Sequence, residues 1–285
     1  MSSLETITSA NLEKYAGLMD AEESDNLGRI YYRTLGVLDD DGNPSGAAIW
    51  QLKYLENDEK KTLSFLRSVS FSDQSEKILF SAYRKLCREE KAASTSFELP
   101  CDENLKYEEA FKKEGFLLKR SEGSDLCVTV GRLKTLALMK KKKVPDYICD
   151  LSGLDDRTFK RGMLNCIFHG HREMTEDLNR LPLEWFERSV SCCSESDGRI
   201  EGFLLVRRHS TGRLKIELLI DVGAEPDMDL LNMIRFSIEK AGEIYPDETE
   251  VIIPRYDAVA RKLTAFIFPH HKGREVLSGT RREES

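Results

Sequence analysis

Hydroxyl and cationic side chains gather just ahead of a predicted helix in the first half of the chain. The cluster consists of Arg67, Ser68, Ser70, Ser72, Ser75 and Lys77. The first turn of a helix presents backbone N–H groups without intrahelical partners, and these groups and the helix dipole attract anions. Hydroxyl donors and positive charges beside such a turn are therefore suited to hold a phosphate or another small anion.

The same segment also has a purely structural interpretation. Asp73 and Glu76 have the spacing of a capping box, in which two side chains satisfy the backbone N–H groups at a helix start. Acidic residues in a first helical turn most often serve as caps and complement the dipole. A helix cap and an anion site remain alternatives for this segment.

Other residue clusters point less clearly to chemistry. His169 and His171 alternate, and His270 and His271 are adjacent, but no cysteine or carboxylate lies at a recognisable metal-ligand spacing. No metal site is expected. The seven cysteines form no CxxC pair, so disulfides are not expected. The adjacent Cys192 and Cys193 are expected to be small buried hydrophobes rather than nucleophiles.

The strands and helices around these residues follow a pattern that occurs twice along the 285 residues. The hexapeptide at 41–46 recurs at 197–202, and each copy opens the same order of a strand, an alternating strand, an amphipathic helix and a short strand ending in proline. Matching landmarks lie 156, 152 and 154 residues apart: Gly46 and Gly202, Leu79 and Leu231, Pro100 and Pro254. The spacing predicts one module written twice.

The first module is predicted from its hydrophobic periodicity. Helices are expected over 11–19 and 26–32, and a hairpin turn ends at Gly42. One strand face carries Ala48, Trp50, Leu52 and Tyr54, and the next strand alternates through Leu63, Phe65 and Val69. A helix from Asp73 has the apolar stripe Ile78, Leu79, Ala82, Tyr83 and Leu86. A strand over 96–100, a helix over 107–114 and a closing hairpin of 116–119 with 126–130 complete the module.

The second module repeats this plan. Its strands are predicted at 203–206, 214–220 and 251–254, with a shortened last strand at 266–269. Its helices are predicted at 155–168, 183–189 and 257–263, and around the stripe Leu230, Leu231, Ile234, Ile238 and Ala241. The polar run Lys140–Lys143 before Pro145 is suited to a connection between domains. This places the domains at 1–143 and 144–285.

Composition narrows the possible partners and location. The net charge is −7, from 43 basic and 50 acidic residues, so no extended nucleic-acid interface is expected. No apolar run approaches the length of about 18 residues that a membrane helix needs. Because the first ten residues lack a basic region followed by an apolar stretch, we expect an unprocessed cytoplasmic protein.

The order of elements in both halves resembles the GNAT acyltransferase superfamily. The resemblance rests on Gly46–Tyr54, Thr62–Glu90, Ser96–Pro100 and Ala110–Phe116, and in the second half on Gly202–Val206, Leu214–Gly242 and Glu250–Leu263. It implies an α/β (α+β) protein of two tandem GNAT-like domains. Each domain would be a mixed, mostly antiparallel twisted sheet flanked by helices.

The resemblance also implies a site for acetyl-CoA. In the family, two adjacent strands splay apart to bind the pantetheine arm, and the next helix start receives the pyrophosphate. The family's signature there is Arg/Gln-x-x-Gly-x-Gly/Ala. Aligned to it, the first half has Ser70, Asp73 and Ser75, and the second half has Val222, Glu225 and Asp227. Neither half keeps the glycines.

The first half is the better candidate for this site. The second half adds Asp229 to its two acids, and a carboxylate about 4 Å from a phosphate costs from about 1 kcal/mol in water to several at a protein surface. The candidate cofactor-binding residues are Arg67, Val69, Ser70, Ser72, Gln74 and Ser75.

Acetyl transfer to an amine further needs a base for the amine proton and an acid for the leaving thiolate. The family often places a tyrosine acid before the closing Gly-Phe, but Phe111 stands there, and Thr264 is its nearest counterpart in the second half. Tyr107, one helical turn earlier, is the candidate acid. Glu98 on the preceding strand is the candidate base. Packing and surface roles remain open for both residues.

The resulting hypothesis is an acyl-CoA-dependent N-acyltransferase, acting with acetyl-CoA on a small-molecule or peptide amine, whose first half is catalytic. The alternative is a non-catalytic tandem GNAT-like binding protein in which both acyl-CoA sites have decayed. Resemblance of fold does not decide between them.

Overall fold

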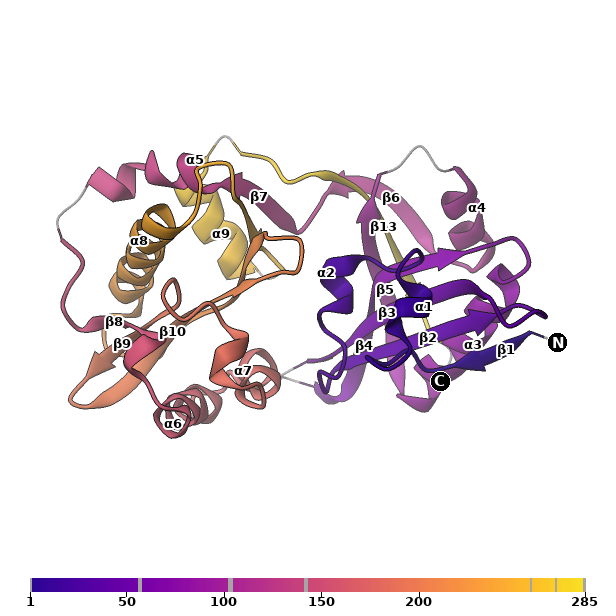
Figure 1. Cartoon of the computed structure of the whole chain (residues 1–285), viewed down its shortest axis with the longest axis horizontal. Coiled ribbons are helices and arrows are strands. Elements are labelled where there is room, and N and C mark those ends of the chain that lie inside the picture. Colours follow the sequence, from indigo (N-terminus) through magenta and orange to yellow (C-terminus); the bar gives the residue numbers. More distant parts are fainter. Residues whose placement is uncertain are drawn as a thin grey trace. The chain divides into compact units, whose positions relative to one another are not determined.

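The structure is a computed structural model that describes residues 2–55, 58–101, 105–140, 143–256, 258–269 and 271–283. It divides into two compact units, residues 1–123 with 274–285 and residues 124–273 (Figure 1). Three predicted features touch positions outside the described residues: His270, the Lys141–Lys142 part of the lysine run, and the helix start at Asp257.

The first unit is built on a seven-stranded sheet with the order β1-β2-β3-β4-β5-β13-β6. Its strands are β1 (Ser3–Glu5), β2 (Tyr32–Leu38), β3 (Pro44–Leu55), β4 (Asp58–Phe71), β5 (Ala92–Pro100), β6 (Leu117–Glu122) and β13 (Glu275–Arg282). The pairing of β4 with β5 is parallel, and the other neighbours pair antiparallel. The expected mixed, mostly antiparallel sheet is therefore present.

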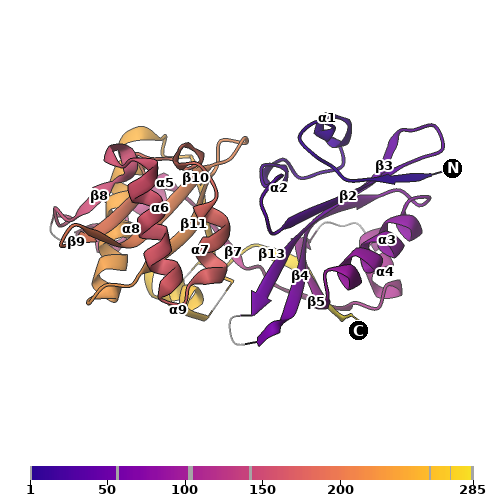
Figure 2. The same ribbon diagram turned by 90° about the horizontal axis from the view of Figure 1, so that it is seen from below.

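Helices cover both faces of this sheet (Figure 2). One face carries α1 (Leu12–Tyr15) and α2 (Ala21–Ser24), and the other carries α3 (Glu76–Glu89) and α4 (Leu105–Lys113). Strand β3 supplies both cores by alternation: Ala47 and Ile49 join the α1 cluster, and Ala48, Trp50 and Leu52 join the α3–α4 cluster. The predicted face of β3 is confirmed for those last three residues. The side chain of Tyr54 lies outside the described part.

The second unit has a six-stranded sheet with the order β7-β12-β11-β10-β9-β8. Its strands are β7 (Asp125–Thr129), β8 (Ile148–Asp150), β9 (Cys192–Ser196), β10 (Arg199–Arg208), β11 (Leu214–Asp221) and β12 (Glu250–Pro254). Its helices are α5 (Val130–Lys134), α6 (Asp156–Phe168), α7 (Arg172–Asn179), α8 (Pro226–Ile244) and α9 (Ala258–Ile267). Phe203 and Leu205 face the α6–α7 cluster, while Leu204 and Val206 face the α8 cluster, so β10 is buried on both faces.

The two copies of the repeated hexapeptide occupy equivalent places. The copy at 41–46 joins β2 to β3, and the copy at 197–202 joins β9 to β10. Gly46 pairs with Phe71 at the end of β4, and Gly202 pairs with Asp221 at the end of β11. β4 leads into α3 and pairs in parallel with β5, and β11 leads into α8 and pairs in parallel with β12. The prediction of one module written twice is confirmed at the level of fold.

The last strand of each module lies in the other unit. The predicted hairpin of 116–119 with 126–130 is wrong: β6 pairs with β13, and β7 pairs with β12. Strand β13 lies between β5 and β6, although it comes from the far end of the chain (Figure 1). Gly123 and Ser124 join β6 to β7 at the division between the units, where Gly123 N–H donates to Arg274 O at 2.9 Å.

This exchange also moves the domain boundary. The expected boundary near residue 143 falls inside the second unit, because β7 and α5 pack there with β12 and α8. The expected last strand at 266–269 is wrong as well, since α9 continues to Ile267 and the true last strand is β13. Local hydrophobic patterns identify strands, but they do not say which partner completes a sheet.

Smaller departures have local causes. The predicted helix at 26–32 is absent, since the nearest helix, α2, ends at Ser24, and 183–189 contains only the 3₁₀ turn Leu183–Trp185. The predicted alternation along β4 fails at a β-bulge, where Ser68 pairs with Ile49 and Leu66 pairs with Trp50. Arg67 is the extra residue. Leu66 and Val69 therefore both face the α3–α4 core.

Candidate functional site

Strands β4 and β5 pair at one end and separate at the other. Their parallel ladder runs from Thr62 opposite Ala92 to Leu66 opposite Phe97 and then stops. Beyond that point β4 continues along β3 as far as Phe71, and β5 continues along β13 as far as Pro100. The two strands thus part where β4 leads into α3. Backbone groups in such a gap are available to an extended ligand that adds hydrogen bonds along a strand.

The loop between β4 and α3 is closed by its own serines. Ser75 is 1% exposed; its Oγ donates to Ser45 O at 2.5 Å and accepts from the Ser72 N–H at 2.9 Å. The Ser72 and Ser75 hydroxyls lie 3.0 Å apart. Ser75 is also the N-cap of α3, so the predicted capping box of Asp73 with Glu76 is wrong. The Ser75 hydroxyl therefore holds the loop shape, while Gln74 is exposed beside it.

The other candidate cofactor-binding residues lie on both faces of β4. The Arg67 guanidinium pairs with the Glu23 carboxylate at 2.7 Å, and both side chains are largely buried. Ser68 accepts a hydrogen bond from the Asp20 N–H at 3.3 Å, so it faces α2. Val69 faces the α3–α4 core, and strand alternation places Ser70 on the opposite face. The positive charge of Arg67 is already matched by a carboxylate.

The two candidate catalytic residues lie on elements that border the gap. Tyr107 in α4 packs edge-on against Phe71, with ring centroids 4.9 Å apart, so its ring lies beside the end of β4. Glu98 is half-buried on β5, one residue past the last β4–β5 pair and opposite Ser278 of β13. Phe111, at the position of the family's tyrosine, stacks on Phe97 inside the core. Its ring offers no proton, as the sequence indicates.

The second unit has the same gap with different surroundings. Its β11–β12 ladder contains only Leu214 opposite Val251 and Lys215 opposite Ile252, although β11 runs on to Asp221. An apolar cavity of about 60 Å³ lies at this split, between β11, β12, α8 and α9. It is lined by side chains such as Ile216, Leu219, Ile253 and Ile267. This space holds no more than a few atoms.

The helix start in the second unit already contains a carboxylate. Asp221 accepts hydrogen bonds from the Ser194 hydroxyl at 2.5 Å and from the Gly223 N–H at 2.8 Å. Burial raises the pKa of Asp221, the Asp229 charge raises it further, and the two hydrogen bonds oppose the shift. Glu225 is the N-cap of α8, and Asp227 and Asp229 lie in its first turn. The expectation of a poor phosphate site in this half is consistent with this arrangement.

The cysteines behave as core residues. Cys192 and Cys193 are 0% and 1% exposed. Burial raises the pKa of Cys193 to about 12 and that of Cys192 well above its usual value, so both thiols stay protonated. The expectation that they are buried hydrophobes is confirmed. Among the described residues no group of histidines, cysteines and carboxylates is arranged to hold a metal ion.

No helix in the described part of the chain is long and apolar enough to cross a membrane.

Three features of the first unit were not predicted from the sequence. The bulge at Arg67, the β13 strand and a large pocket beside α3 were all missed. A bulge leaves no clear sequence signal. The extended run at 275–282 could have suggested β13, and the i, i+4 spacing of Lys77, Ser81 and Lys85 could have suggested a polar face on α3 that borders a pocket.

Comparison with known proteins identifies the fold. No protein-family model and no curated protein matches the sequence. Among solved structures, a tandem GNAT protein from the clavulanic acid biosynthesis pathway matches with a TM-score of 0.60 at 10% identity, covering 100% of this chain and 99% of that one. A probable N-acyltransferase from Enterococcus faecalis V583 matches with a TM-score of 0.54 at 12% identity, covering 100% of this chain and 73% of that one.

A third solved structure gives the same result. The GCN5-related N-acetyltransferase from Sphaerobacter thermophilus matches with a TM-score of 0.50 at 13% identity, covering 100% of this chain and 96% of that one. At these identities the likeness establishes the fold alone. The chain therefore has two GNAT-like folds in tandem, as its sequence pattern indicated.

Proposed function

We propose that this protein transfers an acetyl group from acetyl-CoA to an amine, and that the first unit carries the reaction. The observation that supports this most is the parting of β4 and β5 directly before α3. The second unit has a similar gap, but only an apolar cavity of about 60 Å³ lies there. In that unit the Asp221 carboxylate also accepts a hydrogen bond from the loop N–H of Gly223.

The residues of the first unit suit the cofactor in part. The strand backbone between Arg67 and Phe71 would bind the pantetheine arm, and the loop of Ser70, Ser72, Gln74 and Ser75 would lie beside the pyrophosphate. The buried Ser75 hydroxyl would shape this loop, and exposed Gln74 and the loop backbone would make the direct contacts. Arg67 would act indirectly, because its charge is paired with Glu23.

The chemistry needs two proton transfers. When bound, acetyl-CoA supplies the thioester carbonyl that a neutral amine attacks. The new C–N bond forms as the C–S bond breaks. Glu98 would take the proton that the amine loses, directly or through a water, and the Tyr107 hydroxyl would protonate the departing thiolate. The acceptor would be a small-molecule or peptide amine.

Ligand-dependent stability tests this proposal. A ligand at 100 times its dissociation constant stabilises the native state by about 2.7 kcal/mol, so acetyl-CoA should raise the melting temperature of the unit that binds it. Ser72→Asp and Gln74→Glu each place a carboxylate at the α3 start and should abolish the shift. Asp227→Lys at the α8 start should leave it unchanged.

A control variant tests whether the added charge alone removes the shift, and two outcomes would contradict the proposal. Ser152→Asp adds the same charge at an exposed site of the second unit and should keep the shift. A shift lost in Asp227→Lys but kept in Gln74→Glu would move the site to the second unit. Absence of any shift at millimolar acetyl-CoA would rule the proposal out.

A second candidate is a non-catalytic GNAT-like binding protein. The pairing of Arg67 with Glu23 and the closed contacts between Ser72 and Ser75 favour it, because both remove polar groups that a phosphate would need. Release of free thiol from acetyl-CoA during incubation with a panel of amines separates the two candidates. Tyr107→Phe serves as the negative control for the enzyme.

A further inference from the structure

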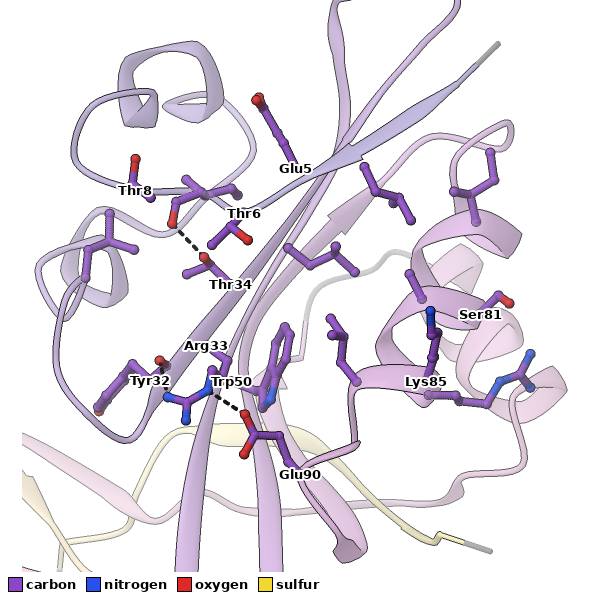
Figure 3. A pocket seen from close by; sticks show the side chains of 18 of the residues that line it. Glu5, Thr6, Thr8, Tyr32, Arg33, Thr34, Trp50, Ser81, Lys85 and Glu90 are labelled. Carbon is purple, nitrogen blue, oxygen red and sulfur yellow. Dashed lines mark hydrogen bonds and ion pairs between the residues drawn. The ribbon is translucent and has the colours of Figure 1, made fainter. Parts of the chain in front are cut away.

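A large pocket lies in the first unit, away from the gap between β4 and β5. Its volume is about 1380 Å³, compared with about 300–1,000 Å³ for typical ligand sites. One wall is formed by the segment 4–9 and by β2, and the opposite wall is α3 (Figure 3). None of the residues from 67 to 75 lines it. The pocket is therefore a different place from the proposed cofactor site.

The floor of the pocket is apolar. Leu35 and Trp50 come from the sheet, and Ile78, Ala82 and Leu86 come from the inner side of α3. Ile7 and Leu27 also line the pocket. Trp50 stands between β2 and α3 in the close view (Figure 3). Such a floor favours an elongated hydrocarbon, because each buried CH₂ group contributes about 0.8 kcal/mol.

The rim of the pocket is positively charged, although the chain carries a net charge of −7. Five cationic side chains line it: Arg33, Lys77, Arg84, Lys85 and Arg88. Three carboxylates also line it: Glu5, Glu90 and Glu114. Arg33 pairs with Glu90 at 2.7 Å and Arg84 pairs with Glu114 at 3.0 Å. The exposed Lys85 amine lies 3.9 Å from the Glu89 carboxylate, which is also exposed. Lys77 and Arg88 have no ion-pair partner among the described residues. The rim therefore attracts an anion.

A buried donor in the pocket wall also lacks a partner. Trp50 is 1% exposed, and its Nε1–H has no hydrogen-bond acceptor within the described structure. A buried polar group without a partner costs about 1–3 kcal/mol. In the close view the Trp50 nitrogen lies toward the end of the pocket that holds Arg33 and Glu90 (Figure 3). A ligand oxygen at this end would satisfy it.

We propose that this pocket binds an elongated apolar molecule with one carboxylate, of the fatty-acid type. Its chain lies along the apolar floor. Its carboxylate lies at the cationic rim, where α3 places Lys85 and Arg88, and accepts the Trp50 N–H. This pocket is separate from the proposed acetyl-CoA site, because none of the candidate cofactor-binding residues, which lie between 67 and 75, lines it.

Trp50 itself can report the binding. The chain has two tryptophans, so Trp185→Phe leaves Trp50 as the single tryptophan. Titration of this variant with dodecanoate, below its critical micelle concentration, should change the Trp50 emission and saturate at one molecule per chain. Dodecanol has the same chain without the charge and should bind at least tenfold more weakly. Acetate should not bind.

Charge variants then locate the head group. Lys85→Gln with Arg88→Gln should weaken dodecanoate binding at least fivefold and leave dodecanol binding unchanged. Lys113→Gln, at an exposed position of α4, is the control and should leave dodecanoate binding unchanged. Circular dichroism confirms that each variant is folded.

Three results would overturn the assignment. These are no dodecanoate binding up to its solubility limit, equal affinities for dodecanoate and dodecanol, and displacement of dodecanoate by acetyl-CoA. The last result would show that the pocket belongs to the cofactor. Loss of acetyl-CoA binding in Gln74→Glu with dodecanoate binding retained would keep the two sites separate.

Discussion

The two units have the same strand gap but different residues around it. Both strands that precede the gap carry a bulge at the same place, with Arg67 as the extra residue in β4 and Glu217 in β11. In the first unit β4 ends at Phe71, which packs against Tyr107, and a loop stabilised by hydrogen bonds between serines follows. In the second unit β11 ends at Asp221, whose carboxylate accepts a hydrogen bond from the Gly223 N–H in the following loop.

This difference separates what maintains a fold from what binds a ligand. Alternating apolar residues, hairpin turns and strand pairing are retained in both units, because they hold each core together. The proposed phosphate site would depend on a few residues at one helix start. A carboxylate such as Asp221 or Asp227 near that start repels a phosphate without disturbing the sheet. The tandem fold can therefore persist with one ligand site lost.

The largest expected effect comes from removal of residues 274–285. The deletion takes away β13, which forms seven residue pairs with β5 and six with β6, and the buried Arg281–Glu283 ion pair. The loss should exceed the stability of the first unit, which is about 5–15 kcal/mol for an ordinary domain. Trp50 emission should report an unfolded first unit, and Trp185 emission should report a folded second one.

The matched control for this deletion is Arg282→Ala, an exposed change within the same strand. It should leave both emissions as in the wild type. A folded first unit in the deletion variant would contradict the arrangement in which β13 completes its sheet.

The next effect concerns catalysis. Tyr107→Phe keeps the ring that packs against Phe71 and removes only the hydroxyl, so kcat should fall about 10²- to 10⁴-fold without loss of folding. Thr264→Val changes the second unit's counterpart of Phe111, a threonine whose hydroxyl donates to Ala260 O of its own helix at 2.8 Å. It should leave kcat unchanged. The measurement is thiol release from acetyl-CoA.

A reversed outcome would be decisive. If Thr264→Val abolished thiol release and Tyr107→Phe did not, the second unit would be the catalytic one.

A smaller effect should follow from the loop hydroxyl. Ser75→Ala removes the acceptor for the Ser72 N–H and the donor to Ser45 O in a buried loop, so the first unit should lose about 1–3 kcal/mol. Denaturant unfolding followed by Trp50 emission measures this loss. Ser75→Thr restores a hydroxyl and should recover part of it. Equal stabilities for Ser75→Ala and the wild type would show that the loop does not depend on this residue.

The smallest effect is a pH dependence in the second unit. Because burial raises the pKa of Asp221 above its unfolded value, its contribution to stability is full below the unfolded pKa and is lost as the pH rises through the folded pKa. The groups around it include Ser194, the Gly223 N–H, Asp229, Glu201 and Cys166. Asp221→Asn does not titrate. The free energy of unfolding of this variant should therefore rise relative to the wild type as the pH increases above about 4, the ordinary pKa of an aspartate.

Unfolding followed by Trp185 emission at several pH values measures this trend. Asp227→Asn, which is exposed in the same helix start, is the control. The same pH trend in both variants would contradict a special role for the burial of Asp221.

Local pattern recovered most elements of the fold. The alternation of Ala48, Trp50 and Leu52 predicted a strand with one face in the core, and the stripe around Leu79 and Tyr83 predicted α3, because side-chain periods of 2 and 3.6 identify strands and helices directly. The pattern failed at β4 after Phe65, where one extra residue reverses the alternation. The candidate residues of the site were located on the right elements, but their partners were not foreseen: Glu23 for Arg67 and Ser45 for Ser75.

The amino-acid sequence alone predicted that one module occurs twice, where most of its strands and helices lie, and that the second copy carries acids at its helix start. Those properties depend on residues close together in the chain. Contacts between distant residues put β7, from the first half of the chain, in the second unit's sheet and β13, from the second half, in the first unit's sheet. They also form the cation-rimmed pocket between β2 and α3. Every non-proline residue of a strand offers the same backbone donor and acceptor, so the choice of partner strand depends on side-chain contacts between residues far apart in sequence.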